Sequence, residues 1–373
     1  MFRNLLKNTD YILIITIIAL FVIGVFGIYS AGYSDTDGSK TEYQKQIMWF
    51  GIVVVIALFL WAIDTSMFSL IGYALYGVSL VLLILVLAMP SAYGATSWFR
   101  IGNVSYQPSE LMKIGFILCA AKVMTMYIEN KESPQPNNTK SYILLGIIAV
   151  LFIVPVFLII LQPDYGTALV YFMILIFMIF KMGIKYRYIF ALLCILLVLI
   201  PVIYNFLPTH AKTRIDVFLN PELDPLGDGY NAIQSKIAVG AGMFLGTGLL
   251  KGSQTQYGYL PVQSSDFIFS VISEELGFVI SATVVILYLV MLTRILKIAS
   301  NAKDKYSSFI AVGIAGMFTF HFIENIGMTI GLLPITGVPL PFVSYGGSNL
   351  LTSGVAMGIV LNISARKDRD VMF

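Results

Sequence analysis

The strongest constraint on the fold of this 373-residue chain is a succession of apolar windows, each long enough to cross the roughly 30 Å hydrocarbon core of a bilayer. We predict ten membrane spans, at residues 11–30, 47–63, 68–90, 110–127, 141–162, 166–182, 187–207, 267–293, 307–330 and 341–364. Charged residues make up only 12% of the chain, whereas soluble proteins carry about 25%. The sequence therefore predicts an all-α polytopic membrane protein, built as one integral membrane domain over residues 1–373.

Positively charged residues predict how these spans are oriented. Ten spans put both termini on one side; with that side cytoplasmic, fourteen Lys and Arg residues lie in inner segments and seven in outer ones. This excess agrees with the positive-inside rule. Membrane anchoring accounts for the net charge of +3, and we predict no nucleic-acid partner.

Ionisable residues in and beside the predicted spans gather in the outer half of the membrane. They are Glu110, Lys113, Asp164, Asp266, Glu274, Glu275, His321 and Glu324. Lys122, near the inner end of the fourth span, is the main exception. Charges at such depth are costly and are usually kept for function. Their distribution predicts a cavity open to the exterior and argues against a proton pathway across the whole membrane.

Asp266 stands where a long polar outer loop, residues 208–265 between the seventh and eighth spans, re-enters an apolar helix. We expect this loop to form short helices on the membrane surface, and loops of this length usually carry function. A carboxylate at its end has two interpretations. It caps the helix N-terminus, or it takes part in chemistry at the membrane–water boundary. The local sequence leaves both open.

Four motifs resemble the SEDS family of bacterial cell-wall enzymes. They are DFIFSVISEELG at residues 266–277, FLNP at 218–221 with DPLGDGYN at 224–231, GLLPITGVPLPFVSYGGS at 331–348, and QPSELMK at 107–113. The resemblance covers essentially the whole chain in order and span count. The MTIG segment at 328–331 is more similar to the elongation branch of that family, RodA, than to the division branch, FtsW.

The resemblance implies a peptidoglycan glycosyltransferase that polymerises lipid II into glycan strands at the outer face of the bacterial cytoplasmic membrane. It implies a class B penicillin-binding protein as partner, and the family's essential acid falls on Asp266. Two other functions remain open: a flippase that moves lipid II outward, and a non-catalytic scaffold that recruits the penicillin-binding protein.

The implied reaction needs a base and cations. Asp266 can take the proton of the attacking hydroxyl, and cations must stabilise the charge on the leaving lipid diphosphate. Arg214 and Lys251 are the candidates, although both residue types also serve as plain interfacial anchors. Gln234 and Ser265 are further candidates for substrate binding, and a divalent cation, Mg²⁺ or Mn²⁺, is a candidate cofactor.

Each of the other polar residues has a structural interpretation as well as a functional one. Glu110 and Lys113, three residues apart, predict an ion pair that also shapes the cavity. Asp164 organises its turn or contributes to function. At least one of Glu274 and Glu275 should pair with or cap a neighbouring segment. His321 is expected to be a satisfied interior residue. Glu324 and Ser348 are expected to line the cavity as polar residues.

Three positions depart from the family pattern. Val262 stands where relatives commonly have Glu, Ser264 and Ser265 replace a His–Thr pair, and Asn349 replaces a common Ser. The first departure removes a second carboxylate near Asp266. It therefore argues against a metal held jointly at positions 262 and 266.

Overall fold

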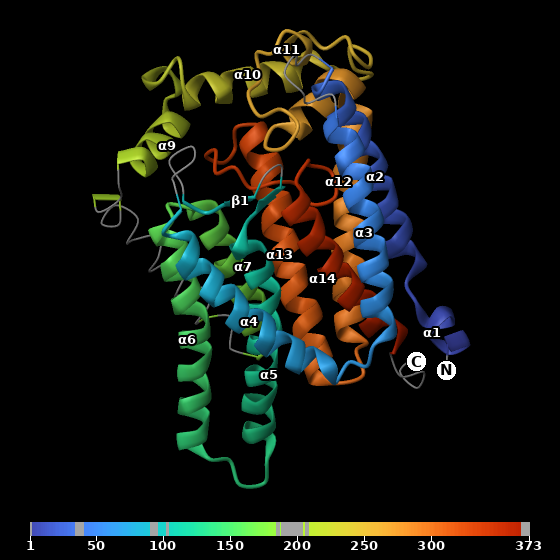
Figure 1. The fold of residues 1–373 in the computed structure, drawn as a ribbon, viewed down its shortest axis with the longest axis vertical. Coiled ribbons are helices and arrows are strands. Elements are labelled where there is room, and N and C mark those ends of the chain that lie inside the picture. The colour runs from blue at the N-terminus through green and yellow to red at the C-terminus, as the bar shows by residue number, and fades with distance from the viewer. Residues whose placement is uncertain are drawn as a thin grey trace.

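The computed structural model describes residues 2–33, 41–89, 96–101, 104–183, 187, 204–205 and 209–366. Long helices form an upright bundle, and a layer of shorter helices crosses one end of it (Figure 1). The predicted seventh span, 187–207, lies outside the described residues except for 187, 204 and 205. Every other predicted span coincides with a helix of the bundle.

Within the described residues, eight helices are long and apolar enough to cross a membrane. They are α2 (Tyr11–Ala31), α3 (Glu42–Ala62), α4 (Met67–Val86), α5 (Pro108–Glu132), α6 (Asn138–Leu161), α12 (Ile268–Ser300), α13 (Lys305–Thr329) and α14 (Gly347–Ala365). A ninth apolar helix, α7 (Tyr165–Lys181), is shorter, at 17 residues. The chain is thus a multi-pass, almost wholly helical membrane protein.

Helices α5, α13 and α14 form the centre of the bundle. Between 72% and 83% of the residues in their apolar windows are buried, against 22% to 44% in the other spanning helices. The peripheral helices expose many Ile, Leu, Val and Phe side chains and bury others against the bundle. This is the pattern of helices that face lipid outward and protein inward. Polar residues on the central helices are therefore shielded from lipid, which lets them form a buried network.

Short elements lie at both ends of the bundle. They are α1 (Phe2–Asn8), β1 (Phe99–Ile101), β2 (Val104–Tyr106), α9 (Thr209–Leu219), the 3-10 helix η2 (Pro221–Leu223), α10 (Asp228–Ala241) and α11 (Ser253–Gln256). Helices α9, α10 and α11 cross the upper end in Figure 1, so the predicted loop 208–265 does contain short helices. At the opposite end, Ser364 donates a hydrogen bond to the Asn8 carbonyl, so α1 and the end of α14 share one side.

Helix α12 is broken at Gly277, whose φ of 75° and ψ of −176° are not helical. A loop reaches the break, and the amides of Phe278 and Val279 donate to the carbonyls of Met243 and Phe244 at 2.8 and 3.3 Å. A Cβ on Gly277 would lie 2.2 Å from the Gly246 nitrogen, so only glycine allows this approach. The sequence predicted an uninterrupted span here. Instead, an outer piece, residues 268–276, is joined to the spanning rod by a non-helical residue.

Candidate active site

Asp266 lies just before α12, at the end of a tight turn in which its amide donates to the Val262 carbonyl at 3.2 Å. Its carboxylate oxygen Oδ1 accepts a hydrogen bond from the Ser265 hydroxyl at 3.0 Å. The N-cap position of α12 belongs to Phe267, and no side chain caps it. The helix-cap interpretation of Asp266 is therefore not the geometry found, and the residue is left half-buried at the end of the bundle that α9, α10 and α11 cross.

The proline-rich turn after α13, residues 331–346, holds the segment around Asp266 in place. Asn325 donates from one amide nitrogen to the carbonyls of Asp266 and Val338, at 3.0 and 2.9 Å. The Ser344 hydroxyl donates to the Ser265 carbonyl at 2.7 Å. A Cβ on Gly337 would lie 3.2 Å from Asp266 Oδ2, so the second carboxylate oxygen rests against a residue without a side chain.

The surroundings of Asp266 set its basicity. Burial raises the pKa of this carboxyl above its usual value, whereas the Ser265 hydrogen bond and the positive charge of Arg214 lower it. Burial is the largest of the three effects. A carboxylate with a raised pKa is a better proton acceptor than an ordinary surface Asp. Arg214 is thus close enough to Asp266 for its charge to influence the pKa of the carboxyl.

A buried polar network connects α5 to α13 and to the proline-rich turn. Lys113 pairs with Glu110 at 2.8 Å, as their three-residue spacing predicts, and its ammonium lies 3.0 Å from His321 Nε2. His321 Nδ1 lies 2.9 Å from the Pro339 carbonyl. Because an ammonium only donates, we assign Nε2 as acceptor and place the ring proton on Nδ1. His321 is thus a satisfied interior residue, as predicted.

The carboxylates of Glu274 and Glu275 both bind a loop and do not face an open cavity. Glu274 accepts hydrogen bonds from the Gln254 amide at 2.7 Å and from the Thr255 amide and hydroxyl at 2.9 and 2.7 Å. Glu275 accepts from the Leu250 amide at 3.1 Å. The prediction that at least one of them caps a neighbour is confirmed, and here both do. Their carboxylates attach residues 268–276 of α12 to residues 250–256.

We expect Glu274→Gln to loosen this loop without unfolding the bundle, because an amide nitrogen cannot accept the hydrogen bonds that one carboxylate oxygen receives. Losing a charged, buried acceptor costs roughly 1–3 kcal/mol. Amide hydrogen exchange over residues 250–257 should therefore accelerate about tenfold or more. Glu222→Gln, on an exposed side chain of the same outer layer, is the matched control. Unchanged exchange in the Glu274 variant would contradict the capping role.

The remaining polar residues of the sequence analysis lie in three places. Asp164 caps α7 through the Thr167 amide at 3.2 Å and also accepts from the Gln107 side chain at 2.7 Å. Glu324, buried on α13, accepts from the Thr336 hydroxyl at 2.7 Å. Ser348 joins α14 to the segment before α5, accepting from the Gln107 amide at 3.3 Å. Glu324 thus contacts the proline-rich turn, whereas Asp164 and Ser348 both contact Gln107, just before α5.

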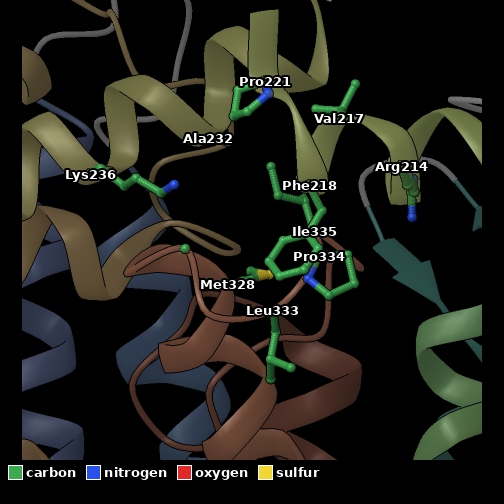
Figure 2. A pocket seen from close by; sticks show the side chains of 11 residues that line it. Arg214, Val217, Phe218, Pro221, Ala232, Lys236, Met328, Leu333, Pro334 and Ile335 are labelled. Carbon is green, nitrogen blue, oxygen red and sulfur yellow. The ribbon is translucent and has the colours of Figure 1, made fainter. Parts of the chain in front are cut away.

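A shallow hollow opens between α9, α10 and the chain that follows α13 (Figure 2). Arg214 and Lys236 supply its charged groups, and its other walls are mostly apolar. Lys251 is exposed and is not among the lining residues. Gln234 lies half-buried on α10, two residues from Lys236 and so on a different face of the helix. Arg214 is thus the predicted cation that borders the hollow.

Comparison with known proteins identifies the family. The profile of the FtsW/RodA/SpoVE family, described as a cell cycle protein, matches residues 11–369. The chain belongs to the FtsW/RodA/SpoVE family. The resemblance to the SEDS family drawn from the four motifs is therefore confirmed.

Curated and solved relatives of this family cover nearly the whole chain. It is 34% identical to the peptidoglycan glycosyltransferase RodA of Treponema pallidum (strain Nichols), over 97% of this chain and 98% of the relative. It is 34% identical to the peptidoglycan glycosyltransferase MrdB of Escherichia coli (strain K12), over 96% and 94%. A peptidoglycan synthase complex described as coordinating polymerization and crosslinking gives a TM-score of 0.80 at 28% identity, over 96% and 99%. The crystal structure of Thermus thermophilus RodA gives 0.70 at 26%, over 97% and 98%.

Of the departures of this FtsW/RodA/SpoVE chain from the family pattern, those at 262, 264 and 265 lie in the turn that ends at Asp266, and Asn349 lies on α14. Val262 has a φ of 47° and an exposed side chain, at the carbonyl that receives the Asp266 amide. Ser265 is the hydroxyl that contacts the carboxylate. Asn349, at the start of α14, accepts from the Ser353 hydroxyl at 2.9 Å. A residue at 262 therefore touches the turn that presents Asp266, and Val there brings no second acid.

The donor set around Asp266 limits the kind of metal site that this family member could form. Among the described residues, no three His, Cys, Asp or Glu side chains gather closely enough to enclose a metal ion. A site made only of protein ligands therefore does not fit. One carboxylate together with oxygens of a substrate phosphate does fit the way Mg²⁺ is often bound.

Two residues that matter in this site were not singled out from the sequence. Asn325 holds the Asp266 and Val338 carbonyls together, and Lys236 extends into the hollow. Asn325 carried one usable signal, since it follows Glu324 and lies one turn after His321 in an otherwise apolar outer half-helix. Lys236 stood out only as a charge on an amphipathic stretch, which is an ordinary feature of a surface helix.

Proposed function

We propose that this chain is a peptidoglycan glycosyltransferase of the elongation type, which polymerises lipid II at the outer face of the bacterial cytoplasmic membrane. The names of its full-length relatives support this activity. The observation that carries the proposal for the site is the half-buried Asp266, with its raised pKa, held rigidly at the outer end of the bundle beside Arg214. The proposed topology has ten spans, both termini in the cytoplasm, and residues 208–265 as an outer loop between the seventh and eighth spans.

In the proposed reaction, the sugar hydroxyl of lipid II attacks the anomeric carbon of a growing strand that is carried on lipid diphosphate. Asp266 takes the hydroxyl proton as the new carbon–oxygen bond forms. The bond from the anomeric carbon to the diphosphate oxygen breaks, and its electron pair leaves with the lipid diphosphate. A positioned base of this kind contributes about 10²–10⁴-fold to a rate.

The leaving diphosphate needs positive charge, and Arg214 is placed to provide it, as Lys251 was also predicted to do. Gln234 and Ser265 stay predictions for substrate contact. A divalent cation, Mg²⁺ or Mn²⁺, also stays a proposal. Asp266 and the diphosphate oxygens would hold it, and it would supply further charge to the leaving group.

We propose a class B penicillin-binding protein as the partner that crosslinks the peptides of the new strand. Support comes from the similar synthase complex, whose description joins polymerization with crosslinking. The decisive experiment purifies the chain with this partner and follows glycan products from labelled lipid II on a gel. Liposomes that carry labelled lipid II test the flippase alternative, because a polymerase makes glycan without moving its substrate across. Growth of cells that carry only an Asp266 variant would instead support the scaffold alternative.

The proposed base predicts a specific pH dependence. Asp266 acts as carboxylate, so activity rises with pH through its raised pKa and is lost below it. The charge of Arg214 lowers that pKa. We therefore expect Arg214→Gln to move the acidic limb of the kcat/KM profile to higher pH. Lys212→Gln, which removes a charge from the same helix α9, should leave the limb in place. If the acidic limb of the Arg214→Gln profile lies at the same pH as that of the native chain, Asp266 is not the titrating group.

A further inference from the structure

The hollow, which Arg214 lines and Asp266 does not, has a cation on each of two sides. Lys236 enters it from α10, and Arg214 stands on α9 across from it (Figure 2). The other lining residues are apolar or glycine: Val217, Phe218, Pro221, Ala232, Met328, Gly331, Leu333, Pro334 and Ile335. A space with two positive charges and apolar walls matches an amphiphile that carries a strongly anionic head group.

The helix that carries Lys236 is fixed firmly to the catalytic region. Its neighbour Ser235 is buried, lies 2.7 Å from the Ser270 hydroxyl of α12, and donates to the Thr329 carbonyl of α13 at 2.8 Å. On the next turn, Ala238 packs in a small apolar cluster with Phe267, the residue after Asp266. Lys236 therefore keeps a defined position relative to Asp266, although its own side chain is exposed.

The path of the Lys236 side chain depends on a glycine. Its aliphatic stem crosses Gly331, where an added Cβ would lie only 1.8 Å from Lys236 Cε. Gly331 has a φ of 75°, a conformation that other residues rarely adopt. No side chain of the described residues pairs with the ammonium of Lys236. The Lys236 side chain thus passes over the backbone of Gly331 and places its ammonium in the hollow. An anionic ligand bound there would be its partner.

We propose that Lys236 and Arg214 together form the binding site for the lipid diphosphate that leaves during strand transfer. This inference rests on the proposed function and names the cation that acts beside Arg214. Lysine serves as a point charge for phosphate, and arginine as a planar donor. As the bond from the anomeric carbon to oxygen breaks, the new negative charge on the diphosphate falls between the two cations. Arg214 connects the proposed diphosphate site with the proposed base, since its charge also acts on Asp266.

Binding of undecaprenyl diphosphate to the full chain in detergent micelles tests this assignment. All variants carry Asp266→Asn, so that binding is measured without turnover and does not depend on whether the chain polymerises lipid II. We expect Lys236→Met to weaken binding about 10- to 100-fold, the usual range for a lost charge-assisted contact. Lys236→Arg should restore affinity to within a few-fold. Lys212→Met removes a charge from α9 at a residue that does not line the hollow; it is the matched control and should bind like the parent.

Several outcomes would overturn the assignment. If the parent and Lys236→Met bind with equal affinity, Lys236 is not part of the diphosphate site. If only Lys251→Met loses binding, the site lies at the exposed loop that carries Lys251. Undecaprenyl monophosphate should bind more weakly and respond less to Lys236→Met, since it presents less charge. Inorganic diphosphate that competes as well as the lipid would show a free-phosphate site. An unfolding midpoint equal to that of the parent shows that Lys236→Met is folded, and Lys236→Gln provides a second test.

Discussion

Replacing Asp266 with Asn should lower lipid II polymerisation by about 10²–10⁴-fold, the contribution of a positioned general base, and so remove visible glycan from a gel assay. The amide has nearly the same shape as the carboxylate but cannot take a proton. The fold should survive, because Asn325 and Val262 hold Asp266 through its main chain. Measurement requires the purified complex with its partner, labelled lipid II and product separation by size.

The matched control is Glu222→Gln, which neutralises an exposed acid in the same outer layer and should polymerise normally. The unfolding midpoint of Asp266→Asn should equal that of the native chain. Glycan of normal amount and length from the Asn variant would refute Asp266 as the base. Loss of the folded state in that variant would instead show that its carboxylate supports structure.

Replacing Lys113 with Met should destabilise the protein by about 3–5 kcal/mol, the cost of leaving one member of a buried ion pair without its partner. Glu110 is 3% exposed and would keep a charge with no cation beside it, while His321 would lose the contact at Nε2. We expect poor recovery of folded protein and a clearly lower unfolding midpoint in detergent.

The double variant Glu110→Gln with Lys113→Met should recover much of that loss, because it removes the unpaired charge as well. Lys122→Met is a control on the same helix. Lys122 lies only partly buried, with its ammonium 5.8 Å from the centre of the Tyr306 ring, a contact worth roughly 0.5–1 kcal/mol. A Lys113→Met variant as stable as Lys122→Met would mean that the buried network contributes little to folding.

Apolar windows predicted the helices of the bundle because the length of a bilayer span is a property of local sequence. The pairing of Glu110 with Lys113 was predictable for the same reason, since both lie on one face of one helix. The position of Asp266 just before a long apolar helix also followed from the point where polar sequence meets apolar sequence. In each case the relevant partners lie within a few residues of each other.

Contacts between distant segments could not be predicted in this way. Glu274 binds backbone amides about twenty residues earlier in the chain, and no local pattern specifies that pairing. Asn325 reaches the Asp266 carbonyl across 59 positions. The break at Gly277 was also missed, since a single glycine in an apolar window is common in packed membrane helices. Its effect depends on a separate loop that supplies carbonyls to the exposed amides.

The interruption of α12 fastens one loop to both pieces of the helix. The amides of Phe278 and Val279, at the start of the lower piece, donate to the carbonyls of Met243 and Phe244, and the carboxylates of Glu274 and Glu275 bind residues further along the same loop. A displacement of this loop is therefore transmitted to both sides of Gly277, and through residues 268–276 to the turn that ends at Asp266.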